Sequence, residues 1–272
     1  MYLTHWQLSA RPFENATDAR FYYPGESQQA ALLKLRYAVE NRQAAAVLAG
    51  ASGLGKTLLV QALLKQLGEK YAPHARIVFP HMPADQLLAL VADQLTGERC
   101  TAVPAISDSV TRLEGFLREN AQAGRHAVVV VDEAHLLRES ETLQTLRLLL
   151  NFEAEAQAPL TLVLVGQSSL LPVIERMPDF DQRLAARCLL RRFAPEETAA
   201  YVQHRLRVAG AAAEIFDSAA LEAIHQHSQG IPRKINRLCD LALLVGFAEE
   251  RRTLQAEQIG AVAEELVVTV AG

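Results

Sequence analysis

The sequence predicts an α/β fold in which a parallel sheet with helices on both faces is followed by an all-helical region. Short, continuous apolar runs alternate along the chain with segments of helical periodicity, which predicts strands that alternate with helices. The apolar runs lack a polar side, as is typical of strands covered on both faces. Only helical patterns follow Phe193. We therefore expect two domains, residues 1–193 and residues 194–272.

The composition is that of an ordinary globular protein. The chain has 272 residues, of which 50% are hydrophobic and 21% are charged, and its formal net charge is −4. These values exclude a disordered chain, and the mild acidity gives no general support for binding to nucleic acid or anionic membranes. The three cysteines are far apart and lack metal-ligand spacing, which favours free thiols in a reducing compartment.

The chain is expected to cross no membrane. Its first residues, MYLTHWQLSA, lack the basic and apolar segments of a secretory signal. The longest apolar run, LALLVGFA, is far shorter than the roughly 20 residues that a spanning helix needs. We therefore expect a cytoplasmic protein.

The elements follow one another in a regular order. Residues 1–25 are aromatic and irregular, with prolines that interrupt them. The predicted strands are 44–50, 75–79, 127–131, 160–166 and 187–193. The predicted helices of the first domain are 26–42, 56–67, 84–96, 108–123 and 140–155. The second domain begins with a helix at Pro195, where proline and two acidic residues favour a helix start, and stays helical to about residue 265.

A glycine-rich stretch, GASGLGKT, separates the first strand from the helix that follows it. It fits the pattern G-x-x-x-x-G-K-[ST], in which bare backbone N–H groups and a helix N-terminus surround phosphates. In such a loop the lysine reaches the β- and γ-phosphates and the hydroxyl residue ligates Mg²⁺. The alternative is a flexible glycine turn. The expected phosphate-binding residues are Gly50, Ala51, Ser52, Gly53, Leu54, Gly55, Lys56, Thr57 and Leu58, with Thr57 also on the metal.

An acidic pair, Asp132 and Glu133, ends the third predicted strand. A carboxylate at the end of a buried strand can hold Mg²⁺ beside the phosphates, which is the role expected for Asp132. Glu133 is placed to accept a proton from an attacking water. The alternative is that both acids cap a helix start. His135 is interpreted as a local structural residue. The sequence DEAH is also the name of a helicase motif, but the chain shows no other helicase signature, so a helicase is not expected.

Several polar residues further along the chain are candidates for supporting roles. Gln167 ends the fourth predicted strand, where an amide could orient the lytic water or sense the γ-phosphate. Arg183, Arg187 and Arg191 recur at a spacing of four, which would place them on one face of a helix, and one of them could reach the nucleotide of a neighbouring subunit. The alternative is a solvated charged face. Arg233 begins a helix and could contact the phosphates from the helical domain.

The whole chain resembles the AAA+ ATPases of the ExeA/GspA type, which serve type II secretion, and their relatives in MSHA-type pilus biogenesis. The segments that carry the resemblance are GKTLLVQALL, VVDEAHLL, TLRLLLNFE, LVGQSSL, YVQHRLRVAG and GIPRKINRLCDLALL, together with the aromatic opening. The resemblance implies a P-loop NTPase αβα core with a helical lid. It places Gln167 at sensor 1, Arg233 at sensor 2 and Arg183 or Arg187 near the arginine finger.

The resemblance also implies that the N-terminal aromatic segment encloses the adenine, with Phe21 and Tyr22 as candidates. Two features depart from the family. Ala51 and Ser52 stand where Glu-Val is common, and long secretion members continue into a membrane span and a peptidoglycan-binding domain. The chain stops at Gly272, as a short member or a shortened piece would.

The expected function is that of a Mg²⁺-dependent ATPase that forms a ring or filament and acts on a secretion or pilus assembly protein. One alternative is a regulator of DNA transposition that binds DNA and recruits a transposase. The other is a nucleotide-dependent switch with little turnover. ATP and Mg²⁺ are the expected ligands in each case, and DNA is a partner only in the transposition alternative.

Overall fold

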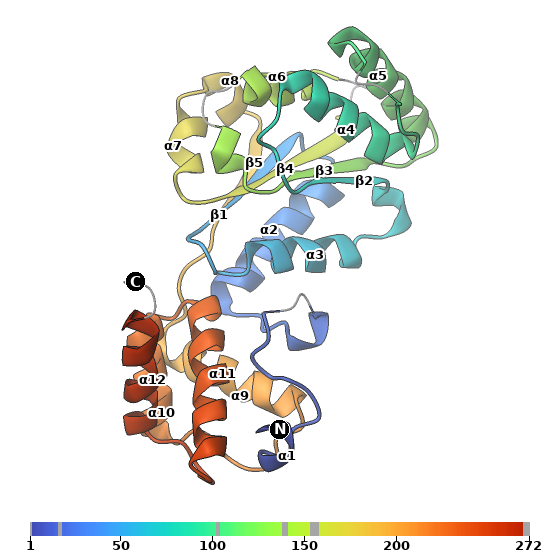
Figure 1. Cartoon of the computed structure of the whole chain (residues 1–272). Coiled ribbons are helices and arrows are strands. Elements are labelled where there is room, and N and C mark those ends of the chain that lie inside the picture. The colour runs from blue at the N-terminus through green and yellow to red at the C-terminus, as the bar shows by residue number, and fades with distance from the viewer. Residues whose placement is uncertain (1, 16–17, 102–103, 138–140, 153–157, 269–272) are drawn as a thin grey trace. The chain divides into compact units, whose positions relative to one another are not determined.

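The computed structural model describes residues 2–15, 18–101, 104–137, 141–152 and 158–268 (Figure 1). The chain divides into two compact units. The sheet unit comprises Ser27–Ser52 and Leu59–Leu190. The helical unit comprises Met1–Glu26, Gly53–Leu58 and Arg191–Gly272. The division between Leu190 and Arg191 lies close to the boundary that the change of pattern after Phe193 predicts.

The sheet unit is built on five parallel strands in the order β2-β3-β4-β1-β5, as the alternation of strands and helices predicts. Their bounds are β1 Ala45–Ala49, β2 His74–Ile77, β3 Ala127–Val131, β4 Leu160–Gly166 and β5 Leu184–Leu189. Every residue of β1, β3 and β4 is buried, which explains why these runs have no polar face. The fifth strand begins and ends earlier than the predicted 187–193, and the helical unit begins two residues after it, at Arg191.

Helices cover both faces of the sheet (Figure 1). Figure 1 shows α2 (Glu26–Glu40) and α3 (Lys56–Gln66) on one face, and α4 (Ala84–Thr96), α5 (Ile106–Gln122) and α6 (Glu141–Leu149) on the other. Short elements complete the unit: η2 Glu69–Tyr71, η3 Ala134–Leu137, α7 Leu170–Glu175 and α8 Pro178–Asp181. The helix predicted over 140–155 is α6, which ends at Leu149; residues 140 and 153–155 of the prediction lie outside the described residues.

The helical unit has a separate apolar core. Its helices are α9 Pro195–Val208, α10 Ser218–Ser228, α11 Pro232–Ala248 and α12 Ala256–Val268. The Asp217 side chain caps α10 by accepting a hydrogen bond from the N–H of Ala220 at 2.7 Å, which satisfies a donor at the helix start. Among the described residues, no helix combines the length and the apolar character needed to cross a bilayer.

The N-terminal segment packs within the helical unit. It contains α1 (Tyr2–His5) and η1 (Ala19–Phe21). The indole N–H of Trp6 donates to the carbonyl of Leu243 at 2.9 Å. The buried guanidinium of Arg205 donates to the carbonyl of Glu14 at 2.9 Å and to the hydroxyl of Tyr201 at 2.8 Å. The sequence order suggests that this segment belongs with residues 1–193, but its aromatic side chains find their apolar neighbours in the helical unit.

We expect Gly230→Ala to destabilise the helical unit strongly. Gly230 has φ +67°, and a Cβ atom there would clash with the carbonyl oxygen of Phe193. The left-handed backbone costs an alanine about 1–2 kcal/mol, and overpacking against the backbone adds about 1–3 kcal/mol. Urea unfolding measures the loss. Gly124→Ala is the matched control, because Gly124 has φ +73° and open space around it; equal losses in the two variants would contradict the clash.

Candidate nucleotide site

The glycine-rich loop connects β1 to α3 and leaves its backbone bare. The N–H of Gly50 donates to the carbonyl of Gly166 at 3.2 Å, so the loop starts against the end of β4. Gly53 and Gly55 have φ values of +82° and +83°, which glycine adopts at little cost. A Cβ atom at Gly55 would meet no atom within 4 Å. The backbone at Gly55 therefore faces open space, as a loop that receives a ligand requires.

The residues that follow the loop carry the charge and the hydroxyl that the motif predicts. Lys56 and Thr57 are the first two residues of α3, where the helix N-terminus favours anions. Lys56 is only 7% exposed, although an ammonium group is rarely buried without compensation. Of the other loop residues, Leu54 is buried and Ser52 is exposed. An open backbone, a lysine and a hydroxyl fit a triphosphate with Mg²⁺.

The acidic pair lies directly after β3. Asp132 is 4% exposed, and its N–H donates to the carbonyl of Ile77 at 2.8 Å, which holds it beside the neighbouring strand β2. Its Oδ1 accepts a hydrogen bond from the N–H of Glu133 at 3.0 Å. Asp132 thus combines a buried carboxylate with a backbone fixed to the sheet, which are the properties of a rigid cation ligand.

Glu133 has an unusual backbone. Its φ of +51° lies in the left-handed region, where a non-glycine residue pays about 1–2 kcal/mol. Such strain is concentrated at functional sites. Its side chain is 47% exposed and therefore reaches solvent, as a base that activates a water must. The Nδ1 atom of His135 lies 3.2 Å from its Oε2, without hydrogen-bonding geometry.

Three predicted residues meet at one edge of the sheet unit. Gly50, Asp132 and Gln167 follow β1, β3 and β4, and these strands are adjacent and parallel. Their carboxyl ends therefore share an edge, which is where ligands bind in open α/β sheets. Gln167 is exposed there. A Cβ atom at Gly166 would lie 3.0 Å from the N of His135, so the small residue lets η3 approach β4 closely.

Arg233 meets the glycine-rich loop through its backbone. Its N–H donates to the carbonyl of Gly53 at 3.2 Å, and a Cβ atom at Gly53 would lie 2.9 Å from the Cβ of Arg233. Only glycine fits at position 53 while this contact is present. The Arg233 side chain is exposed, so its guanidinium is accessible to a ligand of the loop.

The predicted arginine row does not lie on a helix. Residues 184–189 form β5, so the helical face that would have joined Arg183, Arg187 and Arg191 is absent from this segment. Arg183 donates to the carbonyl of Leu150 at 2.6 Å. Arg187 lies on the exposed face of β5, forms an ion pair with Asp181 and keeps a side-chain exposure of 46%. Both finger candidates are exposed, and each already has a partner within the sheet unit.

The adenine candidates differ in accessibility. Phe21 is 7% exposed, and the guanidinium of Arg205 lies 5.0 Å from its ring centroid. Tyr22 is half-buried, and burial raises the pKa of its hydroxyl, which has no hydrogen-bond partner among the described residues. Tyr22 is therefore the more accessible of the two.

Sequence reasoning missed Arg76. Its Nη2 lies 3.6 Å from Oδ2 of Asp132. A lone arginine interrupts the apolar run ARIVF, but the local sequence does not indicate that this arginine contacts Asp132.

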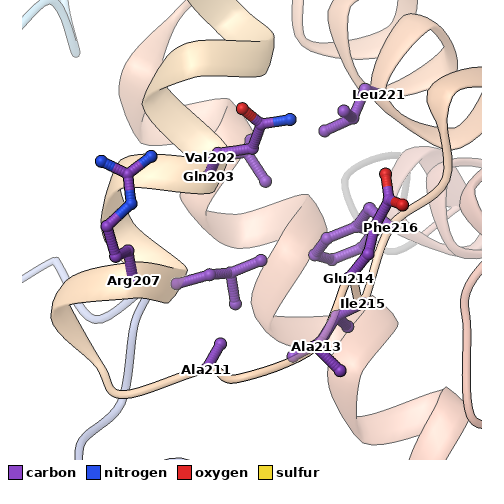
Figure 2. Close-up of a pocket in the computed structure, with 10 residues that line it drawn as sticks. Val202, Gln203, Arg207, Ala211, Ala213, Glu214, Ile215, Phe216 and Leu221 are labelled. Carbon is purple, nitrogen blue, oxygen red and sulfur yellow. The ribbon is translucent and has the colours of Figure 1, made fainter.

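A separate pocket of about 260 Å³ lies in the helical unit (Figure 2). Apolar side chains from α9, α10 and the segment between them form most of its lining, and Gln203, Arg207 and Glu214 add polar groups. None of the predicted site residues lines this pocket.

Comparison with known proteins identifies a matching domain family and a curated relative. The profile of the AAA domain family matches residues 39–174. General secretion pathway protein A of Aeromonas hydrophila is 35% identical over 253 residues, which cover 91% of this chain and 45% of that protein. The chain thus spans about half the length of this curated relative.

Solved structures share the fold at low sequence identity. The ORC2 protein of Aeropyrum pernix, in ADPNP–ADP complexes, matches 94% of this chain and 72% of its own with a TM-score of 0.71 and 16% identity. The Drosophila ORC bound to DNA matches 97% of this chain and 66% of its own with a TM-score of 0.72 and 17% identity. The match to the RuvB Holliday junction branch migration motor of Thermotoga maritima covers 89% of this chain and 70% of the RuvB chain, with a TM-score of 0.57 and 17% identity.

Proposed function

Because the chain belongs to the AAA+ family of P-loop ATPases, we propose that it binds ATP with Mg²⁺ at the glycine-rich loop and hydrolyses it. The observation that carries the proposal is the left-handed backbone of the loop at Gly53 and Gly55, which faces open space at Gly55. A backbone of this kind presents several N–H groups to one anion. The exposed Glu133 beside a buried Asp132 supports hydrolysis in addition to binding.

The proposed mechanism assigns each residue a single task. The loop amides and Lys56 hold the β- and γ-phosphates, and Thr57 and Asp132 hold the cation. Bound Mg²⁺ supplies positive charge that neutralises the phosphates. Glu133 accepts a proton from the attacking water, and Gln167 orients that water. Arg233 contacts the phosphates from α11, and Tyr22, with Phe21 behind it, contacts the adenine.

The process served is proposed from the curated relative. Since general secretion pathway protein A matches 91% of the chain, we assign the protein to assembly of a bacterial secretion or pilus system. It acts as an oligomer, in the cytoplasm, and reaches the inner membrane through a partner. The DNA-transposition alternative has less support, because the likeness to ORC proteins shows only the fold and the net charge is −4. Salt-sensitive DNA affinity would favour that alternative.

Phosphate release measured with ATP in Mg²⁺ and in excess chelator tests the proposed activity. We expect turnover in Mg²⁺ and its loss in chelator. Tight Mg²⁺–ATP binding without turnover would replace the ATPase proposal with the nucleotide-dependent switch, and absence of binding would overturn both.

If an arginine acts on the nucleotide of a neighbouring subunit, specific activity should rise with protein concentration, and Arg187→Ala should lower it. An arginine finger contributes about 10³–10⁵ in rate, so the loss should be large at concentrations where the wild type assembles. Arg183→Ala is measured beside it as the second candidate. Arg118→Ala is the control, because Arg118 is an exposed residue of the sheet unit that forms an ion pair with Glu114 one turn away. A rate independent of concentration, unchanged in Arg183→Ala and Arg187→Ala, would leave both arginines as surface charge.

A further inference from the structure

An arginine on the edge strand contacts the acidic residue proposed to hold the cation. Arg76 lies in β2, and its Nη2 is 3.6 Å from Oδ2 of Asp132. The sheet fixes this contact, because Arg76 pairs with Val130 on β3 and alternate residues of a strand share a face. Asp132 is two residues beyond Val130 and therefore projects on the same side as Arg76.

The guanidinium of Arg76 is aimed at Asp132 and is only partly solvated. The Arg76 side chain is 27% exposed and the Asp132 side chain 6%. The Nε atom of Arg76 is buried and has no hydrogen-bond partner among the described residues. An unpaired buried donor is costly, and an apolar side chain would avoid that cost at this strand position. Among the described residues, Arg76 forms one ion pair, with Asp132. This ion pair explains why a positively charged side chain stands at position 76.

We propose that Arg76 is a positioning residue that holds the Asp132 carboxylate when no cation is bound and opposes Mg²⁺ when it arrives. The inference rests on the proposed role of Asp132 as a metal ligand. A guanidinium and a divalent cation then compete for one carboxylate and repel each other at short range, where a partly buried site screens them weakly. With Arg76 present, Asp132 therefore binds Mg²⁺ more weakly than it would without this arginine. Mg²⁺ binding then depends more strongly on the nucleotide phosphates.

The test measures how much Mg²⁺ is needed for tight binding of a non-hydrolysable ATP analogue, by calorimetric or fluorescence titration of the full chain. Removal of the positive charge in Arg76→Gln should lower the half-saturating Mg²⁺ concentration about three- to tenfold. Arg76→Lys keeps the charge and should stay within about twofold of the wild type. Arg118→Gln removes the charge of an exposed arginine on α5 of the same unit and should have no effect. Arg76→Met, which keeps much of the side-chain volume, should repeat the glutamine result if Arg76→Gln folds poorly.

The outcomes separate this inference from the proposed function. Asp132→Asn should raise the Mg²⁺ requirement. If it does so while Arg76→Gln and Arg76→Met leave the requirement unchanged or raise it, Arg76 does not oppose the cation and the inference is overturned. If Asp132→Asn leaves the requirement of the wild type unchanged, the metal role of Asp132 fails, and the inference fails with it. A purely structural role of Arg76 would lower thermal stability without moving the Mg²⁺ requirement, and that result would also overturn it.

Discussion

Lys56→Ala is expected to lose measurable ATP binding while it keeps the fold. Lys56 is a buried cation at the start of α3, directly after the open backbone at Gly55. Truncation of one partner of a buried charge pair typically costs about 2–5 kcal/mol or more, which weakens ATP binding by about 1.5 to 3.5 orders of magnitude. Calorimetric titration with ATP and Mg²⁺ measures the affinity, and circular dichroism checks the fold.

Lys65→Ala is the matched control for this variant. Lys65 lies in the last turn of the same helix and is exposed, so its removal should leave ATP affinity unchanged. Micromolar affinity retained in Lys56→Ala would contradict the interpretation of residues 50–58 as a phosphate-binding loop.

Glu133→Gln is expected to bind ATP normally and to hydrolyse it about 10²–10⁴-fold more slowly, the usual contribution of a general base. Glutamine has nearly the same size as glutamate, and the cost of the left-handed backbone at φ +51° is expected to stay the same. It cannot accept a proton from water. Binding and turnover should therefore separate, with affinity measured by titration and turnover by phosphate release under saturating ATP.

Glu119→Gln provides the comparison, because Glu119 is an exposed glutamate of α5 in the same unit. Near-wild-type turnover in Glu133→Gln would remove Glu133 from the role of base. A loss of affinity equal to the loss of turnover would instead indicate that Glu133 contributes to the binding of ATP.

The core of the sheet was predictable because its strands are apolar throughout. β1, β3 and β4 are buried on both faces, and a β-branched run such as AVVVV, between a helix and a pair of acids, is typical of a buried parallel strand. The strand ends then follow from topology, which is why Gly50, Asp132 and Gln167 come to one edge. The predicted parallel sheet with helices on both faces is confirmed.

The missed features depend on contacts between distant parts of the chain. The N-terminal aromatic residues carry no signal for their partners, and only the structure places Trp6 against Leu243. The spacing of Arg183 and Arg187 suits a helix, yet the edge position beside β1 makes the segment a strand. Arg76 looks incidental within ARIVF because its contact with Asp132 arises from strand pairing, which local sequence does not specify.

The central proposal is that backbone N–H groups of the glycine-rich loop bind a triphosphate and that Asp132 holds the accompanying cation. A crystal structure with Mg²⁺ and a non-hydrolysable ATP analogue tests it most directly. The account predicts phosphate oxygens within hydrogen-bonding distance of the amides between Gly53 and Thr57, with the cation between the Thr57 hydroxyl and the Asp132 carboxylate. A nucleotide bound elsewhere, with those amides occupied by protein side chains, would contradict it.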